Sequence, residues 1–269
     1  MYFLLRYLRI WWALAKYGLI REASFRGNFL IKVVVEALWL VLLLIFYRAV
    51  FRQTSHVASW SESEYLFFIG CHYTLLAIIE SLFLVNCGRF AEIIRSGEFD
   101  FYLIKPIDEQ FLVSCRTVDW STVPNMILGI SLMIYGTAQT GWQVSCEAVL
   151  LFPLLMLCGV AIAYGFLLMF TSLAVWMTRN QSLFEIWWLF TTLVRYPKDI
   201  FTNTWAHSIG WFFTFLVPVM LVVNVPASSM MKTFQPAFAV YMIAAAVLLL
   251  ILSRIFFRYS LKHYRSASS

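Results

Sequence analysis

Long apolar stretches recur along nearly the whole chain, and they restrict its fold more than any other feature. A helix needs about 20 mainly apolar residues to cross the ~30 Å hydrocarbon core of a bilayer. Six stretches approach or exceed that length, of which the fifth is the shortest: 28–51, 64–87, 117–135, 149–177, 183–196 and 237–257. Only 13% of the 269 residues are charged, against about a quarter in a soluble domain. The sequence therefore predicts an all-α integral membrane protein with six transmembrane helices.

No Gly/Ser-rich linker divides these stretches, so residues 1–269 are interpreted as one transmembrane domain. The five cysteines show no CxxC spacing, and they indicate neither a disulfide framework nor a zinc site. Arg6 and Arg9 interrupt the apolar N-terminal stretch, which is not typical of a cleaved signal peptide. We therefore expect a retained N-terminus and no metal site.

The Lys and Arg residues are divided unevenly between the two ends of the predicted helices. Cytoplasmic loops of membrane proteins have an excess of these residues. With the N-terminus inside, fifteen of the 20 lie on the cytoplasmic side, and the other five are Arg48, Arg52, Arg195, Lys198 and Lys232. Both termini are then cytoplasmic and the number of spans is even, with four spans as the alternative if two weak stretches do not cross. This placement also explains the net charge of +6 without a nucleic-acid partner.

Residues 1–26 have the pattern of a helix that lies in the membrane interface. At 100° per residue, Arg6, Arg9 and Lys16 fall on one side and apolar residues fill the rest. Trp11 and Trp12 are typical anchors at the headgroup level. We expect an interfacial elbow helix before the first span, with a simple extension of that span as the alternative.

Residues 197–236 break the helical pattern repeatedly. The segment contains four prolines and polar residues around a short apolar run: Pro197, Pro218, Pro226, Pro236, Asn203, Thr204 and His207. Irregular backbone is tolerated at membrane depth only where protein or a water-filled cavity covers it. Two interpretations are open, a re-entrant segment that forms an outer gate and a loop on the outer surface.

Motifs for catalysis are missing from the sequence. It contains no GxxxxGK[ST] phosphate loop, no HExxH and no GxSxG. We therefore expect no enzymatic activity and no cofactor in this chain.

Four carboxylates fall within or at the ends of the predicted spans, where ionisable groups are costly and often functional. Glu36 and Glu80 each lie about eight residues from the cytoplasmic end, and Asp119 and Glu185 lie at shallower depth. Lys32 is one turn below Glu36 and can pair with either deep carboxylate. The four acids line a translocation path, or they form a structural Lys–Glu network that neutralises itself.

A short charged island separates the second and third spans on the predicted cytoplasmic side, within the loop 88–114. It consists of Arg95, Ser96, Gly97, Glu98, Phe99, Asp100, Phe101, Tyr102, Leu103, Ile104, Lys105 and Pro106. Gly97 is expected to join two short helices. The apolar residues from Phe99 onward are expected to be exposed within a charged rim, as a docking surface or as an interfacial loop whose aromatic side chains face lipid.

The run SGEFDFYLIKP in this island resembles the pattern sGelDxxLx(K/R)P of an ABC-type export permease family, the type-two-like six-span subunits. Further similar motifs follow in the family's order: RYPKDIF at 195–201, FTFLVP at 213–218 and VPA at 225–227. The order, spacing and six spans agree over nearly the whole chain. The resemblance implies an export permease in a bacterial inner membrane.

This resemblance also implies partners and site residues. Residues 95–103, 105 and 106 would couple the chain to a separate P-loop ATPase dimer, which would bind ATP and Mg. A second permease subunit, identical or paralogous, would complete the path. Tyr196, Pro197, Pro218 and Pro226 are the candidate gate residues. The rival hypothesis is an ATP-independent secondary transporter or channel that uses Glu36 and Glu80.

Overall fold

The computed structural model describes residues 2–24, 26–141, 146–177, 181–202, 207–232 and 234–265. In this part of the chain the regular structure is helical, and one isolated bridge joins Val57 to Trp60. The α-helices are α1 (Tyr2–Ser24), α2 (Arg26–Phe51), α3 (Glu62–Ile79), α4 (Val85–Arg95), α5 (Asp100–Leu103), α6 (Glu109–Cys115), α7 (Val123–Thr140), α8 (Cys146–Ser172), α9 (Gln181–Val194), α10 (His207–Trp211), α11 (Leu221–Met231) and α12 (Pro236–Lys262). Short 3₁₀ or π segments are η1 (Glu80–Leu84), η2 (Trp120–Thr122), η3 (Leu173–Val175), η4 (Lys198–Thr202) and η5 (Phe212–Leu216).

Among the described residues, four helices are long and apolar enough to cross a membrane: Phe29–Phe51, Glu62–Arg95, Glu147–Val175 and Pro236–Lys262. A fifth candidate is the pair His207–Leu216 and Leu221–Met231, which is bent by 93°. The predicted all-helical membrane fold is therefore confirmed. Helices α7 and α9 exist close to the third and fifth predicted spans, but they are not among these candidates, so six spans stay a prediction.

One predicted boundary was wrong. The third predicted span begins at residue 117, whereas α7 begins at Val123 after the 3₁₀ turn η2. The helix of the second predicted span continues through η1 and α4 to Arg95. Asp119 causes the late start of α7, because its side chain caps η2 and accepts a hydrogen bond from Ser121 N at 3.0 Å. A capped turn there sets the helix start after it.

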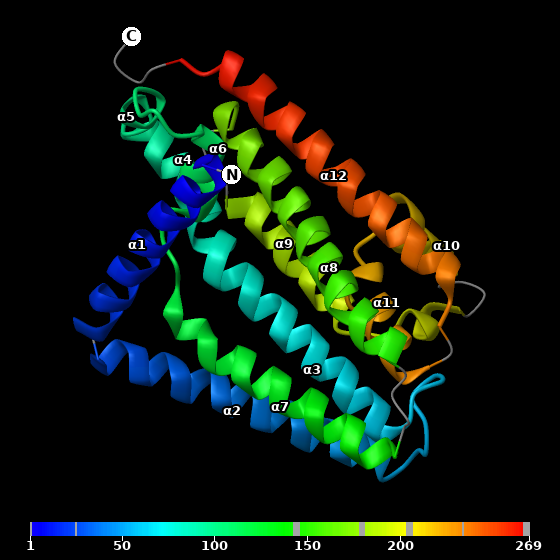
Figure 1. Cartoon of the computed structure of the whole chain (residues 1–269). Helices are drawn as coiled ribbons and strands as arrows, with labels where there is room; N and C mark the ends of the chain where they lie inside the picture. Colours follow the sequence, from blue (N-terminus) through cyan, green and yellow to red (C-terminus); the bar gives the residue numbers. More distant parts are fainter. Residues whose placement is uncertain are drawn as a thin grey trace.

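Helix α7 runs closely along α3 (Figure 1). Glycine makes this approach possible, because a Cβ added at Gly70 would lie 2.6 Å from Gly129 O, and one added at Gly136 would lie 2.8 Å from Ser63 O. Small residues commonly bring helices together in membranes. Helix α8 packs between α12 and α11 in the same bundle, so the main core is formed by α3, α8, α11 and α12 with their neighbours.

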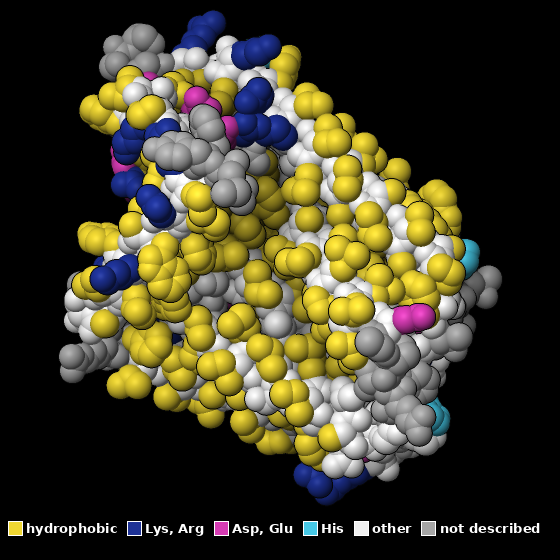
Figure 2. All heavy atoms as spheres, viewed as in Figure 1, with side chains coloured by type: hydrophobic (Ala, Val, Ile, Leu, Met, Phe, Trp, Pro, Cys, Tyr) yellow, Lys and Arg dark blue, Asp and Glu magenta, His cyan; other side chains and the backbone are white. Residues whose placement is uncertain are grey.

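Helices α1 and α2 form an open V beside this bundle (Figure 1). Helix α2 leaves many large apolar side chains exposed, among them Leu38, Trp39, Leu42 and Ile45, as expected of a surface that contacts lipid or another membrane protein. The N-terminal end of α1 and the C-terminal end of α12 lie at the same end of the molecule, beside α4, α5 and α6. Figure 2 shows Lys and Arg side chains gathered at this end, while the middle of the visible face is hydrophobic.

Candidate functional site

The predicted helix–Gly97–helix geometry of the charged island is confirmed. Helix α4 ends at Arg95, and α5 begins at Asp100. Gly97 has φ +72°, a left-handed conformation that glycine adopts without the clash of a Cβ. After this turn, Phe99 N donates back to Ile93 O at 3.2 Å, and α5 packs against α6.

Phe99 and Tyr102 point into the protein, so their predicted exposure was wrong. They are 0% and 1% exposed. The ring of Phe99 lies 5.1 Å from that of Phe90 and 5.0 Å from that of Tyr264. The physical reason is the helical turn itself, because residues three apart share one face, and that face covers an apolar cluster built by α4, α6 and the end of α12.

The opposite face of the same turn is exposed and apolar. Phe101 is 63%, Leu103 42% and Ile104 78% exposed, and we call these three residues the apolar tip. Arg95, Ser96, Glu98, Lys105 and Pro106 around it are also exposed. Asp100 is half-buried and accepts a hydrogen bond from Tyr264 Oη at 3.0 Å.

Charged and polar side chains fasten the island from both sides. Arg116 donates to Glu98 at 2.8 Å and also contacts Tyr102 Oη. From α1, Arg6 donates to Pro106 O at 2.8 Å, and Tyr7 Oη accepts from Asp108 N at 3.0 Å. These bonds fix the residues that flank the apolar tip, and we call this set its base: Glu98, Tyr102, Pro106 and Asp108.

Asp108 links this base to α12. It caps α6 by accepting a hydrogen bond from Phe111 N at 3.2 Å, and Arg254 donates to both of its carboxylate oxygens, through Nη1 at 2.8 Å and through Nη2. The hydrogen bond from Arg254 holds the pKa of Asp108 below its usual value. Sequence reasoning missed this pair, because its members are 146 residues apart and no local pattern joins them.

Glu36 and Glu80 line one cavity of about 560 Å³ between α2 and the bundle. Both also line an adjoining cavity of about 340 Å³, which Asp119 reaches. Glu36 Oε2 accepts a hydrogen bond from Asn125 Nδ2 at 3.1 Å. Glu185 is exposed on α9 and lines neither cavity. The structure therefore brings three of the four predicted carboxylates together.

The expected pairing of Lys32 with a deep carboxylate was wrong. Lys32 Nζ lies 3.9 Å from Asp119 Oδ2 and donates to Ser121 Oγ at 3.3 Å. The early turn η2 places both partners closer to Lys32 than either Glu36 or Glu80. A self-neutralising Lys–Glu network at the deep level is therefore absent from the described residues.

Three further polar side chains line the larger cavity, and sequence reasoning missed all of them: His72, Asn125 and Arg195. Each has one buried polar atom without a hydrogen-bond partner among the described residues, namely His72 Nδ1, Asn125 Oδ1 and Arg195 Nε. Buried polar atoms normally have partners. The cavity thus offers hydrogen-bonding capacity as well as charge, between aromatic walls that include Trp39, Tyr73 and Trp188.

The segment 197–236 contains the broken helix pair, which bends between η5 and α11. Pro197, Pro218 and Pro226 are buried, Pro226 lies within α11, and Tyr196 is 39% exposed. Asn224 Oδ1 accepts from Lys198 N at 2.8 Å, and its Nδ2 donates to Met220 O at 2.7 Å. The buried prolines and this crosslink pack the described part of the segment into the bundle. The polar residues 203 and 204 lie outside the described residues.

The fold and these surfaces define a multi-pass helical membrane protein with a structured loop at one end and a polar cavity within the bundle. A family model described as "ABC-2 family transporter protein" matches residues 37–268. The chain therefore belongs to the ABC-2 transporter family and is a transmembrane permease. No curated protein and no solved structure matches it significantly.

Proposed function

We propose that this chain is the permease subunit of an ATP-driven exporter in a bacterial inner membrane, and that it couples to a separate P-loop ATPase dimer through the apolar tip. Residues 1–269 form one permease domain, with an elbow at 1–26, a coupling loop at 88–114 and an outer re-entrant region at 197–236. Helices α7 and α9 complete six spans, with both termini cytoplasmic. A second permease subunit, identical or paralogous, completes the path, and the ATPase binds ATP and Mg.

The observation that supports coupling best is the two-faced turn of α5. Its inner face is buried in a dedicated apolar cluster, while its outer face presents Phe101, Leu103 and Ile104 to solvent. Exposed apolar side chains surrounded by charged residues, on a segment that is held rigidly in place, are typical of energetically important interface sites. The same end of the molecule is rich in Lys and Arg, as cytoplasmic surfaces are (Figure 2).

A continuous helix connects the loop to the cavity. The helix Glu62–Arg95 contains α3, η1 and α4. Glu80 and the start of the loop therefore belong to one continuous helix. None of the residues of the π segment η1 is buried, whereas Ile79 before it and Phe90 after it are fully buried. A push on the loop would therefore bend this long helix at η1, which begins with Glu80.

Transport by this mechanism requires the ATPase dimer to bind the two states of the permease with different affinities. An ATPase dimer that bound the inward-open and closed states equally would shift neither population. ATP-driven closure of the dimer must therefore favour one position of the apolar tip. In the proposed cycle, this shift closes the cavity of Glu36 and Glu80 on the inner side and opens a path past Tyr196 and the buried prolines.

The proposal is tested by gentle detergent extraction of the tagged chain, mass spectrometry of proteins that co-purify in stoichiometric amounts, and an ATPase assay on that fraction. We expect a P-loop ATPase whose activity responds to the permease. A chain that purifies without an ATPase and moves solute along an ion gradient would replace this proposal with the secondary-transporter hypothesis centred on Glu36 and Glu80.

A further inference from the structure

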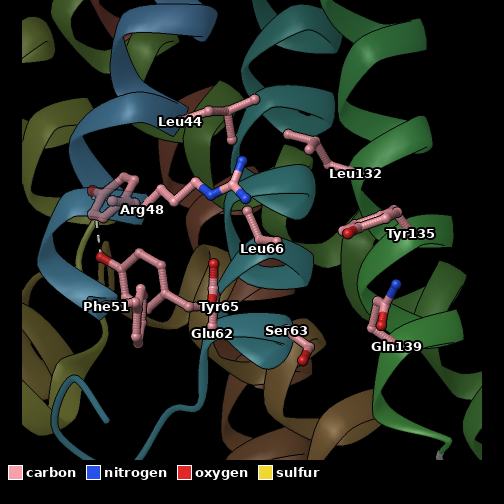
Figure 3. Close-up of a pocket in the computed structure, with 11 residues that line it drawn as sticks. Leu44, Arg48, Phe51, Glu62, Ser63, Tyr65, Leu66, Leu132, Tyr135 and Gln139 are labelled. Atoms are coloured by element: carbon pink, nitrogen blue, oxygen red, sulfur yellow. Dashed lines mark hydrogen bonds between the residues drawn. The ribbon is translucent and has the colours of Figure 1, made fainter. Parts of the chain in front are cut away.

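A third pocket lies far from the coupling loop, between the C-terminal half of α2, the first turns of α3 and the end of α7. It has a volume of about 430 Å³, and Figure 3 shows its side chains in place. None of the residues that line it takes part in the proposed coupling or in the cavity of Glu80.

The pocket contains one cation and one anion that do not neutralise each other. Arg48 reaches into it from α2, and Glu62 lies on the first turn of α3 (Figure 3). Their charged atoms are more than 4.0 Å apart, and neither side chain makes a hydrogen bond or ion pair within the described residues. A cation and an anion held apart on one pocket complement a ligand that has both charges.

The two charges lie at different depths in the pocket. Each of the three helices contributes a leucine toward its middle, namely Leu44, Leu66 and Leu132. Figure 3 shows the guanidinium of Arg48 among these leucines, while Glu62 and Gln139 lie nearer the helix ends. The cation is therefore placed deeper in the bundle than the anion, which is the order of phosphate and ammonium in a phospholipid headgroup.

The walls also open toward lipid. Next to the pocket, α2 exposes Val41 and Ile45, so acyl chains can lie against this helix while a headgroup occupies the pocket. The phenolic hydroxyl of Tyr65 is already engaged with that of Tyr47 at 3.3 Å (Figure 3). Tyr135 and Gln139, on the opposite wall, are exposed and have free donors for a phosphate ester.

We infer that this pocket binds a zwitterionic phospholipid with a primary amine, such as a phosphatidylethanolamine. Its phosphate is bound by Arg48, a geometry that guanidinium groups favour, and its ammonium donates to Glu62. An anionic phosphatidylglycerol would satisfy Arg48 but leave Glu62 without a cation. A choline headgroup has the charge but no N–H donor. This inference requires a membrane environment and does not depend on the ATPase.

Native mass spectrometry of the purified chain, titrated separately with dioleoyl phosphatidylethanolamine, phosphatidylglycerol and phosphatidylcholine, tests it. We expect the ethanolamine lipid to bind most tightly. Arg48→Gln and Glu62→Gln should each raise its apparent Kd by about 10-fold, the effect of one charge-assisted contact. For phosphatidylglycerol, only Arg48→Gln should weaken binding.

Arg52→Gln is the matched control, because Arg52 is an exposed arginine one turn further that does not line the pocket, and it should change nothing. Equal affinity for the three lipids, or an equal loss in Arg52→Gln and Arg48→Gln, would overturn the inference. Thermal unfolding of each variant verifies the fold. If Glu62→Gln is unstable, Gln139→Leu on the opposite wall tests the same pocket, and an unchanged Kd in that variant counts against it.

Discussion

The two faces of the α5 turn give a sharp test of the coupling proposal, because one face should affect docking and the other folding. Phe101 and Ile104 are 63% and 78% exposed, so replacing either with alanine should change the stability of the permease by no more than ~0.5 kcal/mol. If an ATPase buries these side chains, each contributes about 1.5–3 kcal/mol by apolar burial. Alanine keeps part of that area, so we expect each variant to weaken ATPase binding about 10-fold.

Phe99→Ala should show the opposite behaviour. Its ring is fully buried among Phe90, Tyr102 and Tyr264, and removal of a buried phenylalanine side chain costs about 3–5 kcal/mol. The variant should therefore lower the unfolding temperature and lose ATPase binding only as a result of that damage.

The assay measures the affinity of the purified permease for its co-purified ATPase by biolayer interferometry, with thermal unfolding measured on the same preparations. Ile45→Ala on α2 is the control, because Ile45 is also exposed and apolar but lies away from the island and lines none of the three cavities. The reasoning fails if Phe101→Ala and Ile104→Ala bind the ATPase as the wild type does, or if Phe99→Ala unfolds at the wild-type temperature.

Three further predictions concern the turn, its base and the cavity. Gly97→Val should strain the left-handed turn by about 1–2 kcal/mol and reduce transport per ATP hydrolysed in proteoliposomes, whereas an unchanged ratio would remove the turn from the coupling path. Asp108→Asn should destabilise the base by about 1.5–3 kcal/mol at pH 7. Because the folded-state pKa of Asp108 is lowered, this contribution is complete above the unfolded pKa of about 3.9 and is lost as the pH falls through the folded value. The unfolding temperatures of wild type and variant should therefore converge in acid, and a constant difference would contradict the assignment. Glu80→Gln should alter substrate export while leaving assembly with the ATPase intact, and unchanged export in a flux assay would favour a structural role for the carboxylate.

The helical membrane class and most helix positions could be predicted, because they depend on features that are local in the sequence. Apolar length defines α2, α8 and α12, and their observed bounds lie within a few residues of the predicted ones. Gly97 marked the turn between α4 and α5 because glycine is the residue that best tolerates positive φ. The bend in 197–236 was indicated by prolines, which interrupt helices for a local covalent reason.

The contacts that organise the site could not be predicted in the same way. Lys32 pairs with Asp119, which is 87 residues away in the sequence, and Arg254 pairs with Asp108, which is 146 residues away. Which carboxylate each basic side chain reaches depends on where each helix starts. The sequence partly indicates the burial of Phe99 and Tyr102, because residues three apart lie on the same face of a helix. Composition alone did not show that this face would be covered by the end of α12.

The π segment η1 is an irregularity of the long helix, between the cavity and the loop, that the sequence does not indicate. After Glu80 and Ser81 the sequence continues with the apolar residues 82–85, so nothing in the pattern indicates that the helix widens there. A π turn accommodates an extra residue per turn, and the faces after Leu84 are therefore rotated relative to those before Glu80. In the structure, Ser81 O within this segment accepts a hydrogen bond from Asp119 N at 2.9 Å. Asn86, just after it, accepts from Thr117 N at 2.9 Å. The π segment thus holds residues 117–119 against the long helix. This attachment forms a wall of the cavity that Glu80 and Asp119 line.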